Sequence, residues 1–307
     1  MRLRLAAALI VLSCLLLTGC GGSGGSGGST AAGGGKTLEQ LWRADGDDVA
    51  VVPGTQNYVP GNVRVSFLVI DSQGRAVTLP TARVWVSDAL DRTPFLETEA
   101  KIERIGIPGG ETADATHIYV VHLRLPRVGK YWLLAEPDGG PKKVQALGNV
   151  VVVKDDSPLD VGDRAPASET PTLASTHGDM SVLTTRTPPD RRLLRYSVAG
   201  SLEAHAPFVV TFATPKFCSS RLCGPMVDVL DDVAQTFAGI GVRFIHVEVY
   251  AGNDPANGYN RWMKQWGLET EPWTFLVSRQ GVIVARFEGS VSVEELEASV
   301  RSKLAPA

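Results

Sequence analysis

The pattern of apolar residues changes near residue 155, and this change constrains the fold more than any other feature. Before it, apolar and polar residues alternate in short runs between Gly- and Pro-containing turns, as at Val63, Val65 and Phe67. A period of two is typical of a strand with one buried face. Such runs occupy 62–71, 82–88, 116–126, 129–137 and 148–155. The first half is therefore predicted to fold from β-strands.

Several short strands with no convincing helix between them favour an all-β immunoglobulin-like sandwich, which we place at residues 36–155. Nothing in this half indicates catalysis. A sandwich of this kind is expected to act as a spacer or as a protein-binding module. Residues 156–307 then form a second domain with a different pattern.

In that second domain, apolar strands alternate with helical segments. Strands are expected at 207–213, 241–250, 272–278 and 282–289, and helices at 225–238, 256–266 and 291–304. The order is βαβαββα. Short βα connections favour parallel pairing early in this order, and the turn at Gly281 favours a hairpin near its end.

Two cysteines, Cys218 and Cys223, lie where the first of these strands turns into a helix, in the run FCSSRLCGP. The exposed N–H groups and positive dipole end of a helix favour a thiolate over a thiol, and the thiolate is the reactive species. Pro225 is well suited to the first helical position, which places Cys223 near the helix start. The pair is therefore a candidate thiol redox site.

The element order and three local motifs resemble the thioredoxin superfamily. The motifs are Phe217-Cys218 followed by Cys223-Gly224-Pro225, then Glu271-Pro272-Trp273, and the run VGDRAP at 161–166. The resemblance covers about residues 160–305 and implies an α/β thioredoxin-like fold with a βαβαββα core. It also implies a thiol–disulfide oxidoreductase without a cofactor or a metal. Its catalytic residues would be Cys218 and Cys223, and its substrate-binding residues would be Phe217, Gly224, Pro225, Glu271 and Pro272.

The cysteine spacing departs from that family, which has two residues between its cysteines where this chain has four. Either two residues are inserted after Cys218, or Cys223 matches the family's first cysteine and Met226 replaces its second. The family's buried acidic residue is matched by Thr211, so a proton acceptor is missing from that position.

Three alternatives remain open for the cysteine pair. It could be a permanent structural disulfide in a non-catalytic binding module, which suits an oxidising compartment. It could be a peroxiredoxin-like thiol peroxidase, in which Cys218 attacks peroxide and Cys223 resolves it, although Thr211 and Pro215 do not match that family's proline and threonine. It could also bind copper through both cysteines, Met226 and His246.

The N-terminus indicates export and lipidation. Residues 1–19 carry Arg2 and Arg4 before a short apolar run, as in a secretory signal peptide. The run LTGC, which ends at Cys20, resembles a bacterial lipobox, and by this resemblance Cys20 is lipidated. Residues 20–35 then form a Gly/Ser-rich tether.

The predicted location is therefore outside the cytoplasm, anchored to the cell membrane through the lipid. The expected partners are cell-envelope proteins with thiols or disulfides. Nucleic acid is not expected, because the formal net charge is −3 and no basic cluster occurs.

Overall fold

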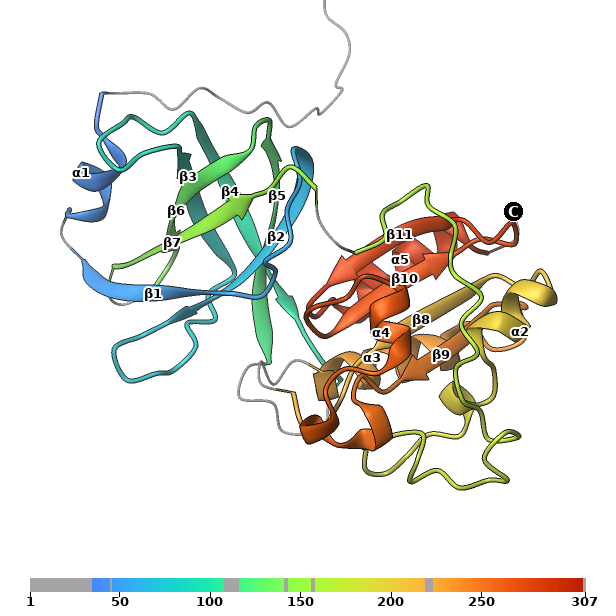
Figure 1. The fold of residues 1–307 in the computed structure, drawn as a ribbon. Coiled ribbons are helices and arrows are strands. Elements are labelled where there is room, and N and C mark those ends of the chain that lie inside the picture. The colour runs from blue at the N-terminus through green and yellow to red at the C-terminus, as the bar shows by residue number, and fades with distance from the viewer. Residues whose placement is uncertain are drawn as a thin grey trace, which may run out of the picture.

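The computed structural model describes residues 35–44, 46–107, 116–140, 143–155, 158–218 and 223–305. The predicted signal peptide, Cys20 and all but the last residue of the predicted tether lie outside these residues. The described chain forms two units, one of β-strands and one of strands and helices (Figure 1). No helix in the described ranges is long and apolar enough to cross a membrane.

The first unit is a closed barrel of seven strands in the order β1-β2-β5-β4-β3-β6-β7. Adjacent strands are antiparallel except β1 and β7, which pair in parallel and close the barrel. The strands are Asp47–Pro53 (β1), Gly61–Ile70 (β2), Thr81–Ser87 (β3), Leu96–Arg104 (β4), His117–Leu125 (β5), Gly129–Pro137 (β6) and Val144–Val152 (β7).

The alternation in the sequence gives the barrel its core. Inward-facing side chains of the strands form one hydrophobic cluster, in which Phe67 stacks on Tyr119 with ring centroids 5.5 Å apart. Helix α1 (Leu38–Trp42) lies outside the barrel and packs Leu38 against Trp85 and Leu134. The barrel therefore has an interior filled by side chains.

The second unit is a four-stranded sheet in the order β11-β10-β8-β9, with helices on both faces. Strands β8 and β9 are parallel, whereas β10 runs antiparallel to β8 and to β11. The strands are Phe208–Phe212 (β8), Arg243–Val247 (β9), Trp273–Val277 (β10) and Ile283–Glu288 (β11). The helices are Arg192–Leu194 (η1), Val198–Glu203 (α2), Cys223–Thr236 (α3), Ala251–Asn253 (η2), Pro255–Asn257 (η3), Arg261–Gln265 (α4) and Val293–Lys303 (α5).

The two central strands of this sheet are buried along their whole length, because each face carries its own hydrophobic core. Apolar side chains of α3 and α5 pack on the face that includes Val209 and Leu276. Side chains of α2 and α4 pack on the opposite face, where Trp266 contacts Phe212 and Phe275. This burial explains why these strands read as continuous apolar runs.

The fold class predicted from the sequence is wrong. The described chain is mostly β-structure with a closed seven-stranded barrel and only short helices, not an α/β thioredoxin-like fold behind an immunoglobulin-like sandwich. The sequence prediction missed β1 and β4. Strand β1 joins β2 to β7, and β4 joins β3 to β5, so these two strands close the barrel. In β4 only Ala100 is buried, which hides the alternation.

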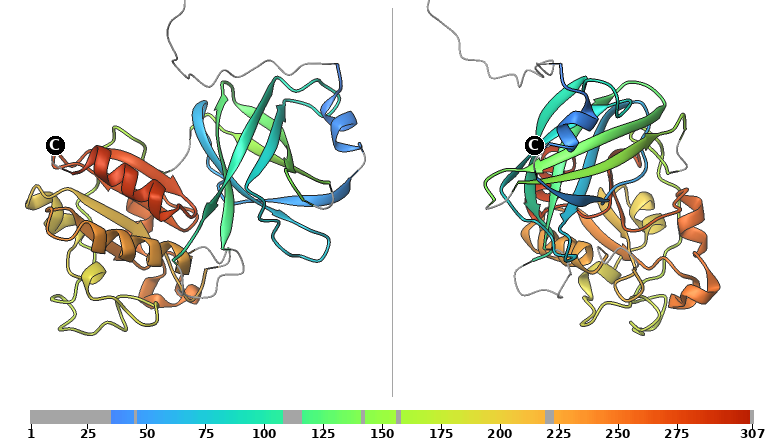
Figure 2. Two further views of the ribbon diagram at one scale, coloured as in Figure 1. Left: turned by 180° about the vertical axis from the view of Figure 1, so that it is seen from behind. Right: turned by 90° about the vertical axis from the view of Figure 1, so that its left-hand side faces the viewer.

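The barrel and the second unit lie side by side (Figure 2). Polar contacts join them. Arg64 of β2 donates two hydrogen bonds to the carboxylate of Glu295 in α5, at 2.8 and 2.7 Å. The carboxylate of Glu288 accepts hydrogen bonds from the backbone N–H groups of Gln56 and Asn57, both at 2.8 Å. These charge-assisted contacts fix the orientation of the two units.

The Arg64–Glu295 pair gives a test of this interface. Its side chains are only 12% and 18% exposed, so Arg64→Met would leave the carboxylate of Glu295 without its cation in a poorly solvated place. We expect a loss of about 2–4 kcal/mol in the free energy of unfolding, measured by urea denaturation. Arg92→Met is the matched control, because the Arg92–Asp88 pair is more exposed and should change stability by less than about 0.5 kcal/mol. Equal effects of the two substitutions would contradict the stabilising role assigned to the Arg64–Glu295 pair.

Candidate functional site

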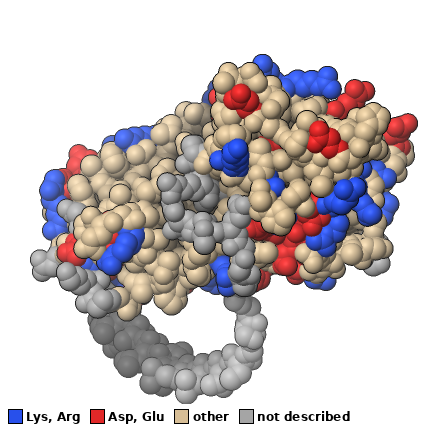
Figure 3. Space-filling model, turned by 90° about the horizontal axis from the view of Figure 1, so that it is seen from below, with Lys and Arg blue, Asp and Glu red and all other residues tan. Residues whose placement is uncertain are grey.

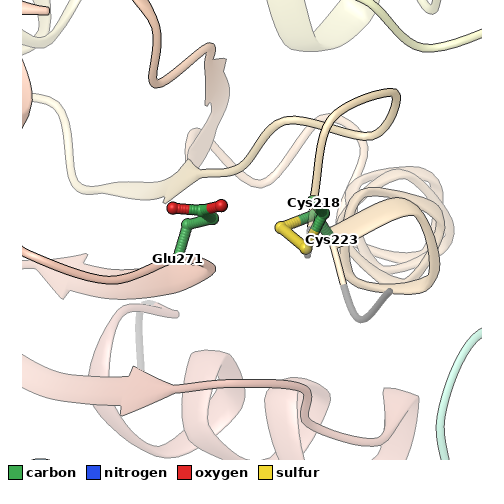
Figure 4. Close-up of side chains that lie close together, drawn as sticks. All are labelled: Cys218, Cys223 and Glu271. Atoms are coloured by element: carbon green, nitrogen blue, oxygen red, sulfur yellow. A yellow bond between two sulfur atoms is a disulfide. The ribbon is translucent and has the colours of Figure 1, made fainter. Parts of the chain in front are cut away.

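The structure joins Cys218 and Cys223 in a disulfide with Cα atoms 5.9 Å apart (Figure 4). Cys218 follows β8 and is half-buried, whereas Cys223 is the first residue of α3 and is fully buried. Residues 219–222, including Arg221, lie outside the described residues. The two cysteines therefore differ in exposure, and Cys218 is the more exposed residue.

The predicted substrate-binding residues occupy two elements of the site. Gly224 and Pro225 follow Cys223 in the first turn of α3 and are buried. The barrel approaches this turn, since a Cβ built on Gly106 would lie 3.4 Å from Cβ of Pro225. Phe217 precedes Cys218 and is half-buried. The barrel therefore lies next to the helix turn that carries Cys223.

Glu271 lies beside the disulfide, as Figure 4 shows. A carboxylate oxygen of Glu271 and the two Sγ atoms all lie within 4.8 Å of one another. The Glu271–Pro272 peptide bond is cis, and Pro272 is buried immediately before β10. The sequence placed Glu271 near the cysteines by family resemblance, and the structure brings the three side chains together.

Two tyrosines that the sequence reasoning missed form one wall of the site. Tyr259 donates a hydrogen bond from its hydroxyl to Oε2 of Glu271 at 2.7 Å. Its ring stacks on Tyr250 with centroids 5.4 Å apart, and Tyr250 meets Phe217 edge to face at 6.5 Å. Burial, followed by the neighbouring Glu271, raises the pKa of both tyrosines. The two tyrosines are therefore neutral hydrogen-bond donors at physiological pH.

A buried polar network lies beneath the segment that leads to Cys218. A ring nitrogen of His246, Nε2, is 3.0 Å from the carbonyl oxygen of Ala213, and Nδ1 is 3.3 Å from Oγ1 of Thr184. Thr185 donates from its backbone and its hydroxyl to Oε1 of Glu248, at 2.5 and 2.7 Å. The hydroxyl of Thr185 also accepts from the backbone N–H of Lys216 at 3.2 Å. These contacts fix the backbone on the approach to Cys218.

Ion pairs fasten the same polar segment to α3. Arg186 donates to Oδ1 of Asp228 at 2.7 Å, and Arg192 donates to Oδ1 of Asp231 at the same distance. Burial and the carboxylate of Asp190 raise the pKa of Asp231 to about 6. In the sequence this stretch is recognisable only as polar. Its role as a restraint on α3 follows from the ion pairs that its arginines form with Asp228 and Asp231 of that helix.

The copper-binding alternative gains no support from His246, because both of its ring nitrogens are close to protein oxygens. Met226 is fully buried in the hydrophobic cluster that also contains Cys223. The group of candidate metal ligands within the described ranges consists of Cys218, Cys223 and Glu271. Thr211, which matches the buried acidic residue of the thioredoxin superfamily, has no carboxylate. Its hydroxyl is 2.9 Å from the hydroxyl of Thr274 within the sheet. Glu271 is therefore the acidic group that the structure puts next to the sulfurs.

His246 makes stability dependent on pH. Burial lowers its pKa in the folded protein, so the unfolded chain binds more protons than the folded chain as pH falls through about 6.5. Stability from neutral His246 is present above that pH and is lost below it. We expect the wild-type chain to lose about 1 kcal/mol more than His246→Gln between pH 7.5 and 5.5. Denaturant unfolding at both pH values measures the difference, and parallel losses in the two proteins would rule out this role of His246.

Comparison with known proteins identifies no family. No family model and no curated protein sequence matches the chain. The solved structures similar to it include an endo-beta-1,4-mannanase from Thermotoga petrophila, with 19% identity and a TM-score of 0.22, covering 36% of this chain and 21% of that chain. Another is the solution structure of the PKD domain from human VPS10 domain-containing receptor SorCS2, with 15% identity and a TM-score of 0.19, covering 47% and 99%. Similarities at these TM-scores support no inference about fold or function.

Proposed function

We propose that this protein exchanges disulfides with protein partners of the cell envelope through Cys218 and Cys223. The observation that carries the proposal is the difference in exposure between the two cysteines, because Cys218 is half-buried and Cys223 is fully buried. An exchange reaction needs one sulfur that a partner can reach and a second that resolves the mixed disulfide from inside. The lipobox resemblance at Cys20 supports anchoring outside the cytoplasm.

The exchange follows a simple order of bonds. A partner thiol gives up its proton and, as a thiolate, attacks Sγ of Cys218. The bond to Cys223 breaks, and a mixed disulfide forms. The thiolate that leaves is Cys223, at the first turn of α3, where backbone N–H groups and the helix dipole stabilise negative charge. A second partner thiol then attacks the partner's own sulfur in the mixed disulfide. The partner leaves with a disulfide, and this chain gains two electrons and two protons as two thiols.

Glu271 is the proton carrier in this proposal. Its carboxylate lies within 4.8 Å of both sulfurs, and Tyr259 orients it. It accepts the proton of the attacking partner thiol and delivers it to the Cys223 thiolate. Glu271 thereby takes the role of proton acceptor, which Thr211 cannot fill because it has no carboxylate. The reverse exchange uses the same groups in the opposite order.

Phe217, Tyr250 and Tyr259 provide an aromatic wall beside the pair, which suits an apolar side chain of a partner segment. On the face drawn in Figure 3, acidic and basic side chains are interspersed, and neither sign covers the face. That face therefore offers no strong long-range steering by charge to an approaching partner.

A second candidate function is a binding module in which the disulfide is a permanent staple. The complete burial of Cys223 favours it. The two functions differ in one measurable property, the ease with which the folded protein is reduced.

The reduction potential of the Cys218–Cys223 pair is the direct test. We expect a value between about −120 and −270 mV, measured by equilibration with glutathione buffers and alkylation of the thiols. The sample is the full chain carrying Cys14→Ala and Cys20→Ala, so that one pair is measured. A potential below about −300 mV, with thiols that react only after unfolding, would assign the pair a structural role.

Substitution of Glu271 tests its role as proton carrier. We expect Glu271→Gln to slow exchange with a small dithiol by about tenfold at pH 7. The deficit should shrink as pH rises toward 9, because the attacking thiol is then already ionised. Glu269→Gln is the matched control, since Glu269 is exposed and is not part of the cluster. Faster exchange in Glu271→Gln would contradict the assignment, because it would mean that the carboxylate acts only by repelling the thiolate.

A further inference from the structure

The two sulfurs and the carboxylate come from three separate places in the fold. Cys218 follows β8, Cys223 begins α3, and Glu271 precedes β10. Their ligand atoms lie within 4.8 Å of one another (Figure 4). A convergence of this kind defines a small polar centre whose chemistry depends on the oxidation state of the sulfurs. In the disulfide, neither sulfur is a thiolate.

Reduction would turn this centre into a set of metal ligands. A dithiol that transfers two electrons and two protons becomes a disulfide itself and leaves Cys218 and Cys223 as thiols. A divalent cation can then displace the two thiol protons and bind two thiolates and one carboxylate. Two sulfurs and one oxygen suit Zn²⁺, which accepts both donor types, whereas Cu(I) favours sulfur alone and Mg²⁺ favours oxygen alone.

The distances fit a single zinc ion. Around a tetrahedral Zn²⁺, with Zn–S near 2.3 Å and Zn–O near 2.0–2.2 Å, neighbouring ligand atoms lie about 3.5–3.8 Å apart. The two Sγ atoms and the carboxylate oxygen lie within 4.8 Å of one another. Once the disulfide opens, a movement of about 1 Å or less by each side chain would bring these atoms to the distances around a zinc ion. Cys218 and Glu271 are half-buried, so the fourth position would be open to water or to a partner.

The carboxylate is already held in place. Tyr259 donates to Oε2 of Glu271 at 2.7 Å, and the tyrosine ring is stacked on Tyr250. A hydrogen bond from a second residue to a ligating carboxylate orients it and typically raises metal affinity by about 10–100-fold. The ligand Glu271 therefore needs little ordering when a metal binds.

We propose that the reduced protein binds one Zn²⁺ ion through Cys218, Cys223 and Glu271, and that the disulfide excludes the ion. Zinc binding is then gated by the oxidation state of the pair. The site uses the cysteines of the proposed exchange reaction but requires only that they can be reduced. If the protein binds zinc but does not exchange disulfides, only the zinc proposal holds. If it exchanges disulfides but binds no zinc, only the exchange proposal holds.

The test is a zinc titration of the full chain carrying Cys14→Ala and Cys20→Ala, kept reduced by a phosphine and measured against a chromophoric chelator. We expect one Zn²⁺ per chain, release of about two protons on binding, and protection of both thiols from alkylation. The oxidised protein and the Cys218→Ser/Cys223→Ser variant should bind none. Exchange activity is assayed separately in the presence of a zinc chelator.

Variants of the acidic and tyrosine residues assign the third ligand. We expect Glu271→Gln to weaken zinc binding at least tenfold and Tyr259→Phe to weaken it about tenfold, whereas Glu269→Gln should leave it unchanged. Equal affinity of Glu271→Gln and wild type would overturn the site as proposed. A reduced, folded chain that binds no zinc would also overturn it, as would a disulfide that cannot be reduced without unfolding.

Discussion

The antiparallel pairing of β8 with β10 is the constraint on which the candidate site depends. Its register sets Trp273 opposite Phe212, so the beginning of β10 lies next to the end of β8. The segment that leads to Cys218 leaves the sheet there, and Glu271 arrives there two residues before Trp273. A change of this register by one residue would turn the buried side chains of one of the two strands to the opposite face of the sheet. The packed core therefore fixes the geometry of the sulfurs and the carboxylate.

The polar segment around residues 180–195 adds a second restraint. It reaches the backbone near Cys218 through Thr185 and reaches α3 through Arg186 and Arg192. The backbone before Cys218 is thereby fastened to His246 in β9 and to Glu248 just after it. The same polar segment is also fastened to α3, which begins with Cys223. Charged groups in such poorly solvated places cost free energy unless paired, so these contacts hold the segment in one arrangement. Both sulfurs are in this way carried on restrained backbone.

The barrel contributes to the position of the site from outside. Its strand β2 binds α5 through Arg64, and the turn at Gly54 meets Gly289 so closely that a Cβ added to Gly289 would clash with the carbonyl oxygen of Gly54. Gly289 also has a positive φ of 74°, which favours glycine. Both contacts involve the end of β11 or the helix after it. The junction therefore acts on the candidate site only through the sheet and the helix that follows it.

The sequence by itself determined the strands and helices around the cysteines. The expected strand at 207–213 and helix at 225–238 are found as β8 and α3, because continuous apolar runs and a cysteine turn with Pro225 are local signals. Only the tertiary structure decided that β1 and β4 close a barrel, since a period of two is the same in a barrel and in a sandwich. It also decided that Tyr259, at the end of a loop, would hold Glu271 beside the sulfurs. Contacts between residues distant in sequence leave no local pattern, and they depend on how the whole core packs.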